Sequence, residues 1–423
     1  MDNGTTYSAL NSTSFSKGTW CLNFQPLYNS GLLTGLSNGE VHLLDWSTQK
    51  SISHFKSREV AISAIQVLNS DHHNASLFAA AALDSVKVYD VRSDSRDHVA
   101  ELRDEHRGAP FLSLDSRHGL LACGTELLNS DSSLLIYDTR NWSKPLREFH
   151  DIHHDDITSL KFHPSDSKLL LSGSTDGYVN VYDLTQQEED DVLHQVINFA
   201  SIHSCGWLAP KRIFSLSHME TFEIDELNDK SEELELREPK PLEFGDVREL
   251  WGCDYTVDIY PGFVATGRSQ EGSGELKILP MEGEKVNVSG AIVIKSAHGD
   301  DVVRDVLVPE TDKSLLYSCG EDGTVKTWKY NNGGALQVPS TFWDYTKKFD
   351  VFDIDMDARM DTESETPLQE AGSEEVTSAM GSNRPDDEKS EEPTNRRKHR
   401  RKEKGEKRKR EKKPRKSHRY NPY

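Results

Sequence analysis

The stretch FHDIHHDDITSLKFHPSDSKLLLSGSTDGYVNVYDL, residues 149–184, contains three short apolar runs separated by turn residues. The first run alternates through Leu160 and Phe162 and ends at His-Pro-Ser-Asp, and the second covers Leu169 to Leu171. The third follows the turn Ser-Thr-Asp-Gly and alternates toward Tyr182. A period of two residues with tight turns predicts three short β-strands and not a helix.

The same pattern recurs near the other end of the apolar part of the chain. Residues 297–329 read AHGDDVVRDVLVPETDKSLLYSCGEDGTVKTWK. Four positions correspond at separations of 145 or 146 residues: His153 with His298, Ser172 with Ser318, Asp176 with Asp322, and Tyr182 with Trp328. Agreement over four positions indicates an internal repeat.

Weaker copies of the repeat are found through the alternating run that closes each unit. Seven such runs are spaced 42 to 55 residues apart: VHLLD (41–45), VKVYD (86–90), LLIYD (134–138), VNVYD (179–183), TFEID (221–225), LKILP (276–280) and VKTWK (325–329). Units of this length, built from short strands, match the blades of a β-propeller. A blade cannot bury its own faces, so blades stack around an axis, and closure of the ring hides the sheet edges.

The two complete copies resemble WD repeats. In that family the His, the strand Ser, the turn Asp and the closing aromatic residue form a hydrogen-bonded stack inside each blade. The run at 153–184, FGDVREL (244–250) with GFVATGR (262–268), and SLLYSCGEDGTVKTWK (314–329) are similar to the family of WD repeat-containing protein 89 over most of residues 15–330. The resemblance implies an all-β, seven-bladed WD40 β-propeller over residues 1–342. The first residues are expected to form the outermost strand of the last blade, with Ala335–Pro339 as the alternative closure.

The composition and charge indicate that the part of the chain beyond the propeller differs from the propeller. The chain has 423 residues, 35 % hydrophobic and 29 % charged, with a formal charge of −21. Residues 343–394 are rich in Asp, Glu, Ser and Thr, and we expect an acidic disordered linker because they offer little apolar surface to bury. Residues 395–423 hold 16 Lys and Arg against three acids and are expected to be a basic disordered tail.

The basic tail predicts where the protein resides. Its dense clusters are typical of nuclear import signals or nucleic-acid contacts, and we assign import to Arg396, Arg397, Lys398, Lys407, Arg408, Lys409 and Arg410. We therefore expect the nucleus and the nucleolus, with some protein in the cytoplasm. Contact with RNA through the tail would be nonspecific, since no aromatic residue is interleaved before Tyr420. The alternatives are a solubilising tail, or a tail masked by the acidic part of the chain.

Two closing runs end in the pattern Asp-x-Arg, with Asp90 before Arg92 and Asp138 before Arg140. In some WD proteins this box docks onto the adaptor of the cullin-4 ubiquitin ligase, so the resemblance implies a substrate receptor as an alternative function. An Arg after the closing strand could offer its planar fork to an acidic or carbonyl partner. The competing interpretation is a salt bridge to the preceding Asp, or a solvated loop.

Other residue patterns predict neither a metal site nor an enzyme. His150, His153, His154, Asp155 and Asp156 suggest metal ligands, but we favour the blade stack for His153 and a strand-entry turn for the acids. Motifs of hydrolases, P-loop proteins and zinc proteases are missing, so we expect no catalytic residue, no metal and no cofactor. The five scattered cysteines and the lack of a signal peptide or membrane span indicate an intracellular, soluble protein. We expect a monomeric subunit of a larger complex, with other proteins bound to the propeller faces.

Overall fold

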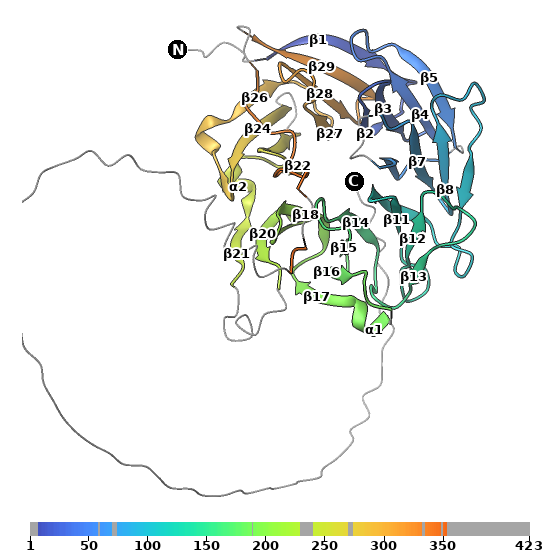
Figure 1. Ribbon diagram of the computed structural model, residues 1–423. Helices are drawn as coiled ribbons and strands as arrows, with labels where there is room; N and C mark the ends of the chain where they lie inside the picture. Colours follow the sequence, from blue (N-terminus) through green and yellow to red (C-terminus); the bar gives the residue numbers. More distant parts are fainter. Residues whose placement is uncertain are drawn as a thin grey trace, which may run out of the picture. The chain divides into compact units, whose positions relative to one another are not determined.

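A computed structural model describes most of the predicted propeller and the segment that follows it. The described residues are 7–57, 60–69, 74–187, 189–228, 240–269, 274–331, 335–347 and 350–352. They form seven antiparallel sheets that are arranged as the blades of a ring (Figure 1). The predicted all-β, seven-bladed propeller is therefore confirmed.

Each of the first four blades is a meander whose strands run from the ring axis outward in sequence order. Blade 1 contains β2 (Cys21–Leu27), β3 (Gly31–Leu36), β4 (Glu40–Leu44) and β5 (Ser51–Lys56). Blade 2 contains β6 (Ala64–Val67), β7 (Leu77–Ala82), β8 (Ser85–Asp90) and β9 (Ala100–Leu102). Blade 3 contains β10 (Phe111–Arg117), β11 (Leu120–Thr125), β12 (Leu134–Asp138) and β13 (Arg147–Phe149). Blade 4 contains β14 (Ile157–Phe162), β15 (Leu169–Ser174), β16 (Tyr178–Asp183) and β17 (Leu193–Asn198).

The remaining blades keep this plan with small additions. Blade 5 contains β18 (Ile202–Ala209), β19 (Arg212–Ser217), β20 (Thr221–Glu226) and β21 (Leu242–Asp246). Blade 6 contains β22 (Tyr255–Tyr260), β23 (Phe263–Arg268), β24 (Glu275–Glu282), β25 (Lys285–Val286) and β26 (Ile292–Lys295), the last two both pairing with β24. The only helices among the described residues are α1 (Glu189–Val192), α2 (Val247–Trp251) and η1 (Val288–Gly290), and none of them is long enough to cross a membrane.

The ring closes through the first residues of the chain, which is the first of the two predicted alternatives. Blade 7 contains β27 (Val303–Leu307), β28 (Leu315–Gly320) and β29 (Thr324–Tyr330), and its outermost strand is β1 (Tyr7–Ser14). The pairing is antiparallel and joins Tyr7 to Tyr330 at one end and Ser14 to Thr324 at the other. Strands from the two ends of the propeller sequence thus share one sheet, which ties the ring together.

The hydrophobic core lies in layers between neighbouring blades. The second strand of a blade is covered on both faces, so β3 and β15 are buried at every residue. One layer joins blade 1 to blade 2 through Leu33, Phe55 and Phe78. This placement explains the continuous apolar run Leu169–Leu171, because a strand with no solvent face does not alternate.

Aspartates on the innermost strands add polar links between blades. Asp305 of β27 accepts hydrogen bonds from the Phe24 amide of blade 1 at 2.7 Å and from the Tyr260 hydroxyl of blade 6 at 2.8 Å. Burial raises the pKa of Asp305 to about 6, although these donors favour its ionised form. Asp115 makes the same kind of link from blade 3 to the Phe162 amide of blade 4, at 2.7 Å.

The propeller has two faces, which the antiparallel strands define. Turns between the first and second strands, and between the third and fourth, lie on one side, which we call the strap face. Turns between the second and third strands, and the connections from one blade to the next, lie on the other side, which we call the open face. Together these two faces and the outer strands make up the protein surface.

The segment after blade 7 packs on the strap face, and we call residues 335–347 and 350–352 the strap. Leu336 and Val338 join the core of blades 6 and 7, and Pro339 lies so close to Gly262 that a Cβ there would meet its Cδ at 2.4 Å. Trp343 donates to Ser165 Oγ at 2.8 Å in blade 4. The expected linker boundary at residue 343 thus falls inside a packed segment, because isolated apolar residues without alternation give no strand signal.

Candidate functional site

The structure brings together the four side chains predicted for the stack of blade 4. Asp176 can only accept, so His153 Nδ1 donates to Asp176 Oδ2, at 2.9 Å. His153 Nε2 then accepts from Ser172 Oγ at 2.7 Å, and Tyr182 donates to the same Oγ at 2.6 Å. The stack therefore runs from the turn between β15 and β16 to the third strand.

Blade 7 holds the second predicted stack with an indole in place of the phenol. Trp328 Nε1 donates to Ser318 Oγ at 2.9 Å, Ser318 lies 2.7 Å from His298 Nε2, and His298 Nδ1 lies 2.8 Å from Asp322 Oδ1. Burial opposes ionisation of Asp322, but His298, the Thr324 hydroxyl and the Lys326 charge outweigh it and lower its pKa to about 2.

A Ser-His-Asp chain is also the arrangement of serine nucleophiles, so its surroundings decide its role. Ser172 and Ser318 are fully buried, and each already accepts a hydrogen bond from the aromatic residue of its blade. A substrate cannot reach a hydroxyl in that position. The two stacks therefore act as polar ties inside blades 4 and 7.

The two Asp-x-Arg boxes adopt the geometry of a local salt bridge. Arg92 donates through Nε and Nη2 to both oxygens of Asp90, at 3.0 and 2.8 Å, and Arg140 does the same to Asp138 at 2.9 and 2.7 Å. The Arg side chains are 72 % and 86 % exposed. The Arg140 hydrogen bonds lower the pKa of Asp138 to about 2. Both boxes lie on the strap face, at the ends of β8 and β12.

Another Asp-x-Arg box was not predicted from the sequence, because it does not follow the third strand of a blade. Arg248 pairs with Asp246 through Nε at 3.0 Å, and Asp246 caps the start of α2 by accepting from the Arg248 amide. This box lies in the connection from blade 5 to blade 6 and so belongs to the open face. It can serve as a control for experiments on the other two Asp-x-Arg boxes.

The strap covers part of the strap face and contacts it through a buried apolar side chain, a hydrogen bond and a cation–π contact. Val351 is fully buried, and its amide donates to Asp166 Oδ2 at 3.0 Å in blade 4. Tyr345 lies under the Arg117 guanidinium of blade 3, at 5.1 Å from its carbon to the ring centroid. Blades 3 to 7 all contact the strap, so the chain itself occupies much of the surface on this side.

The exposed apolar side chains of the described residues form two groups that lie on different surfaces of the propeller. One group follows the open face from blade to blade: Trp20, Leu83, Leu127, Tyr178, Met219 and Leu250. The other group lies on or beside the outermost strands: Leu10, Ile52, Val99, Leu146, Val196, Leu242 and Val288. Three of these, Val99, Leu146 and Val288, lie in connections from the third to the fourth strand, at the rim of the strap face. The open face is the surface whose loops present exposed apolar side chains from one blade to the next.

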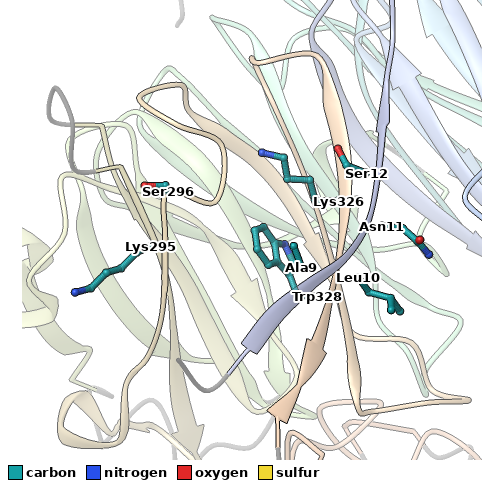
Figure 2. A pocket seen from close by; sticks show the side chains of 8 residues that line it. All are labelled: Ala9, Leu10, Asn11, Ser12, Lys295, Ser296, Lys326 and Trp328. Atoms are coloured by element: carbon teal, nitrogen blue, oxygen red, sulfur yellow. The ribbon is translucent and has the colours of Figure 1, made fainter. Parts of the chain in front are cut away.

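A shallow groove lies beside the ring-closing strand (Figure 2). It has a volume of about 470 Å³ and lies between β1 and the end of β26, with the Trp328 indole between them. Lys326 on its wall donates to the Ala297 carbonyl at 2.6 Å and lies 3.2 Å from Asp322. The lining residues include no carboxylate, histidine or thiol, so the groove has no acid–base pair.

The histidines and acids that suggested a metal site do not converge as a group. His153 is bound in its stack, His154 Nδ1 lies 2.9 Å from Asp131, and Asp156 accepts from the Leu127 amide at 2.7 Å. His150 instead lies beside Ser133, at 3.1 Å. All five cysteines are buried and free. The seven basic residues assigned to nuclear import lie outside the described residues.

Comparison with known proteins agrees with this architecture. The family model described as WD domain, G-beta repeat, matches residues 143–183 and 292–329, the regions that hold the two stacks. The uncharacterized WD repeat-containing protein YNL035C of Saccharomyces cerevisiae is 59 % identical over 349 residues, covering 82 % of this chain and 88 % of its own length. The uncharacterized WD repeat-containing protein C63.06 of Schizosaccharomyces pombe is 27 % identical over 254 residues, 58 % of this chain and 76 % of that protein. The WD repeat-containing protein 89 homolog of Dictyostelium discoideum is 26 % identical over 255 residues, 58 % and 66 % of the two chains.

Proposed function

This chain belongs to the WD-repeat family of β-propellers, and from that premise we propose that it is a non-catalytic nuclear scaffold whose open face holds protein partners. The observation that carries the proposal is the series of exposed apolar side chains on that face. Apolar residues dispersed among polar loops are typical of protein interfaces, whose cores exclude water while their rims stay wet. The strap occupies much of the opposite face, which leaves the open face for partners.

The charge of the open face indicates the chemistry of the partner. Burial and the nearby Asp156 raise the pKa of Glu126, and burial and Asp155 raise that of Asp156, so these carboxylates repel one another. A cationic side chain placed between them would relieve that repulsion. We therefore propose a partner that presents Lys or Arg around an apolar centre, within ribosome biogenesis or another nuclear assembly.

The test compares two double variants with equal changes of charge. Leu83→Lys with Met219→Lys alters the open face, and Leu146→Lys with Val196→Lys alters the outer strands at equally exposed positions. Quantitative mass spectrometry of proteins that co-purify with each variant should show partner loss for the open-face pair only, while circular dichroism shows both folded. Equal partner recovery from both variants would refute the assignment of the face.

The nuclear part of the proposal rests on the composition of residues 395–423. A chain without these residues should move from the nucleus to the cytoplasm, as seen by microscopy of a fluorescent fusion. Nuclear retention would show that import depends on a bound partner. If the tail also contacts RNA, the RNA recovered with the full chain should fall steeply with salt, because such binding depends on counterion release.

A substrate receptor for the cullin-4 ligase is the second candidate, and the adjacent placement of Arg92 and Arg140 favours it. Both lie on the strap face of neighbouring blades and both are well exposed. The double variant Arg92→Glu with Arg140→Glu should abolish recovery of the ligase adaptor. The control Arg248→Glu changes the same local pairing on the open face and should have no effect. Unchanged adaptor recovery from the double variant, or no adaptor with the unaltered chain, removes this candidate.

A further inference from the structure

Three side chains gather at the edge of blade 3, one of them 42 and 44 residues before the other two. His106 lies in the connection from β9 to β10, Glu148 lies in β13, and His150 follows that strand. Their ligand atoms all lie within 4.8 Å of one another. Glu148 and His150 are two positions apart, so they project to the same side of the strand while Phe149 between them is buried.

The two separations between imidazole and carboxylate match those around a tetrahedral metal ion. His106 Nε2 lies 3.1 Å and His150 Nε2 lies 3.3 Å from Glu148 Oε2. Zinc bonds to nitrogen and oxygen are about 2.0–2.2 Å long, so ligand atoms at the corners of a tetrahedron are about 3.3 Å apart. Two imidazoles with one carboxylate are also a donor set that zinc accepts, with the fourth position left for water.

Neighbouring groups support the binding of a cation. His150 Nδ1 lies 3.1 Å from the buried Ser133 Oγ, and a hydrogen bond between them would orient the imidazole with Nε2 toward Glu148, as a metal ligand requires. Asp104 lines a cavity of about 80 Å³ together with His106 and Glu148. Asp104 is 3 % exposed, and its Oδ2 is buried without a hydrogen-bond partner. A metal-bound water in that cavity would supply the missing donor.

We propose that His106, Glu148 and His150 form a binding site for a divalent transition metal, with zinc as the best match, and with Ser133 as the group that orients His150. The site joins the connection between blades 2 and 3 to the outer strand of blade 3. His106 is well exposed, so a metal ion can reach the site from solvent. This site is independent of the apolar residues assigned to partner binding.

The test measures zinc binding by the full chain with isothermal titration of zinc chloride. His150→Gln and Glu148→Gln should each weaken binding of one equivalent at least tenfold, and Ser133→Ala should weaken it about tenfold, as loss of a group that orients a ligand does. Tetrahedral cobalt(II) absorption should appear with the unaltered chain and be lost with His150→Gln. Circular dichroism checks that each variant is folded.

The matched control uses a similar cluster on blade 1. There His42 Nε2 lies 3.2 Å from Glu40, and His54 stacks on His42 at 5.5 Å between ring centroids, while Arg96 donates to His54 Nδ1. His54→Gln should therefore leave zinc affinity unchanged. The proposal is overturned if His150→Gln and Glu148→Gln bind zinc as the unaltered chain does, or if His54→Gln weakens binding as much as they do.

Discussion

Replacement of Asp322 by Asn should destabilise the propeller through the stack of blade 7. The carboxylate is 15 % exposed and accepts from His298, from the Thr324 amide at 3.0 Å and from the Thr324 hydroxyl at 2.7 Å. The Asn side chain has nearly the same shape but carries no charge, and it turns one acceptor into a donor. Asp322→Asn therefore removes electrostatic stabilisation with little change in packing.

The magnitude follows from the pKa of Asp322. Its value of about 2 lies almost two units below the ordinary aspartate value of about 3.9, and each unit corresponds to about 1.4 kcal/mol. The ionised side chain thus contributes between about 2 and 3 kcal/mol to the free energy of unfolding. Because the folded pKa is lowered, this contribution is complete above the unfolded value and is lost as the pH falls toward 2. About half of it should remain at about pH 3.

Urea unfolding followed by tryptophan fluorescence measures the effect at neutral pH and again at about pH 3. Trp328 belongs to the stack, so its emission reports on the altered blade. Asp138→Asn is the control, because that carboxylate also has a pKa of about 2 but its partner Arg140 is 86 % exposed, so solvent screens the ion pair. A loss below about 0.5 kcal/mol for Asp322→Asn, or a loss that does not shrink on acidification, would refute the reasoning.

Two further predictions concern blade 5 and the strap. Burial, Asp225 and the cross-strand partner Glu243 raise the pKa of Glu223 to about 7, so the folded protein loses stability as the pH rises through that value. Glu223→Gln should therefore stabilise it on the order of 2 kcal/mol at about pH 8 and have little effect at about pH 4, as thermal melts at the two pH values would show. Trp343→Ala should cost about 2 kcal/mol in the same melts, because it removes a packed indole and its bond to Ser165, whereas Asp344→Ala should be nearly neutral. Equal melting temperatures for these last two variants would show that the strap adds no stability.

Much of the fold could be predicted from the sequence because each blade is formed almost entirely by residues that are close together in the chain. A strand and its turn lie within a few residues of each other. The alternation of apolar residues and the turn aspartates Asp176 and Asp322 can therefore be recognised directly in the sequence. The four residues of the stack could be located because they recur at nearly one spacing, and the resemblance to WD repeats implied the hydrogen bonds among them. The strap was not readable, since the packing of Trp343 and Val351 depends on the shape of a surface formed by other blades.

The sequence by itself determined the repeat and the number of its copies, because these follow from short-range periodicity along the chain, and its resemblance to WD repeats implied the two stacks and the closing role of the first strand. Only the tertiary structure decided which surface the chain covers with its own strap, and that Arg92 and Arg140 bind their own neighbouring acids. It alone brought His106 to Glu148 and His150 across two blades. Contacts of that kind depend on how separate blades are placed around the ring, and the spacing of residues within one blade holds no record of that placement.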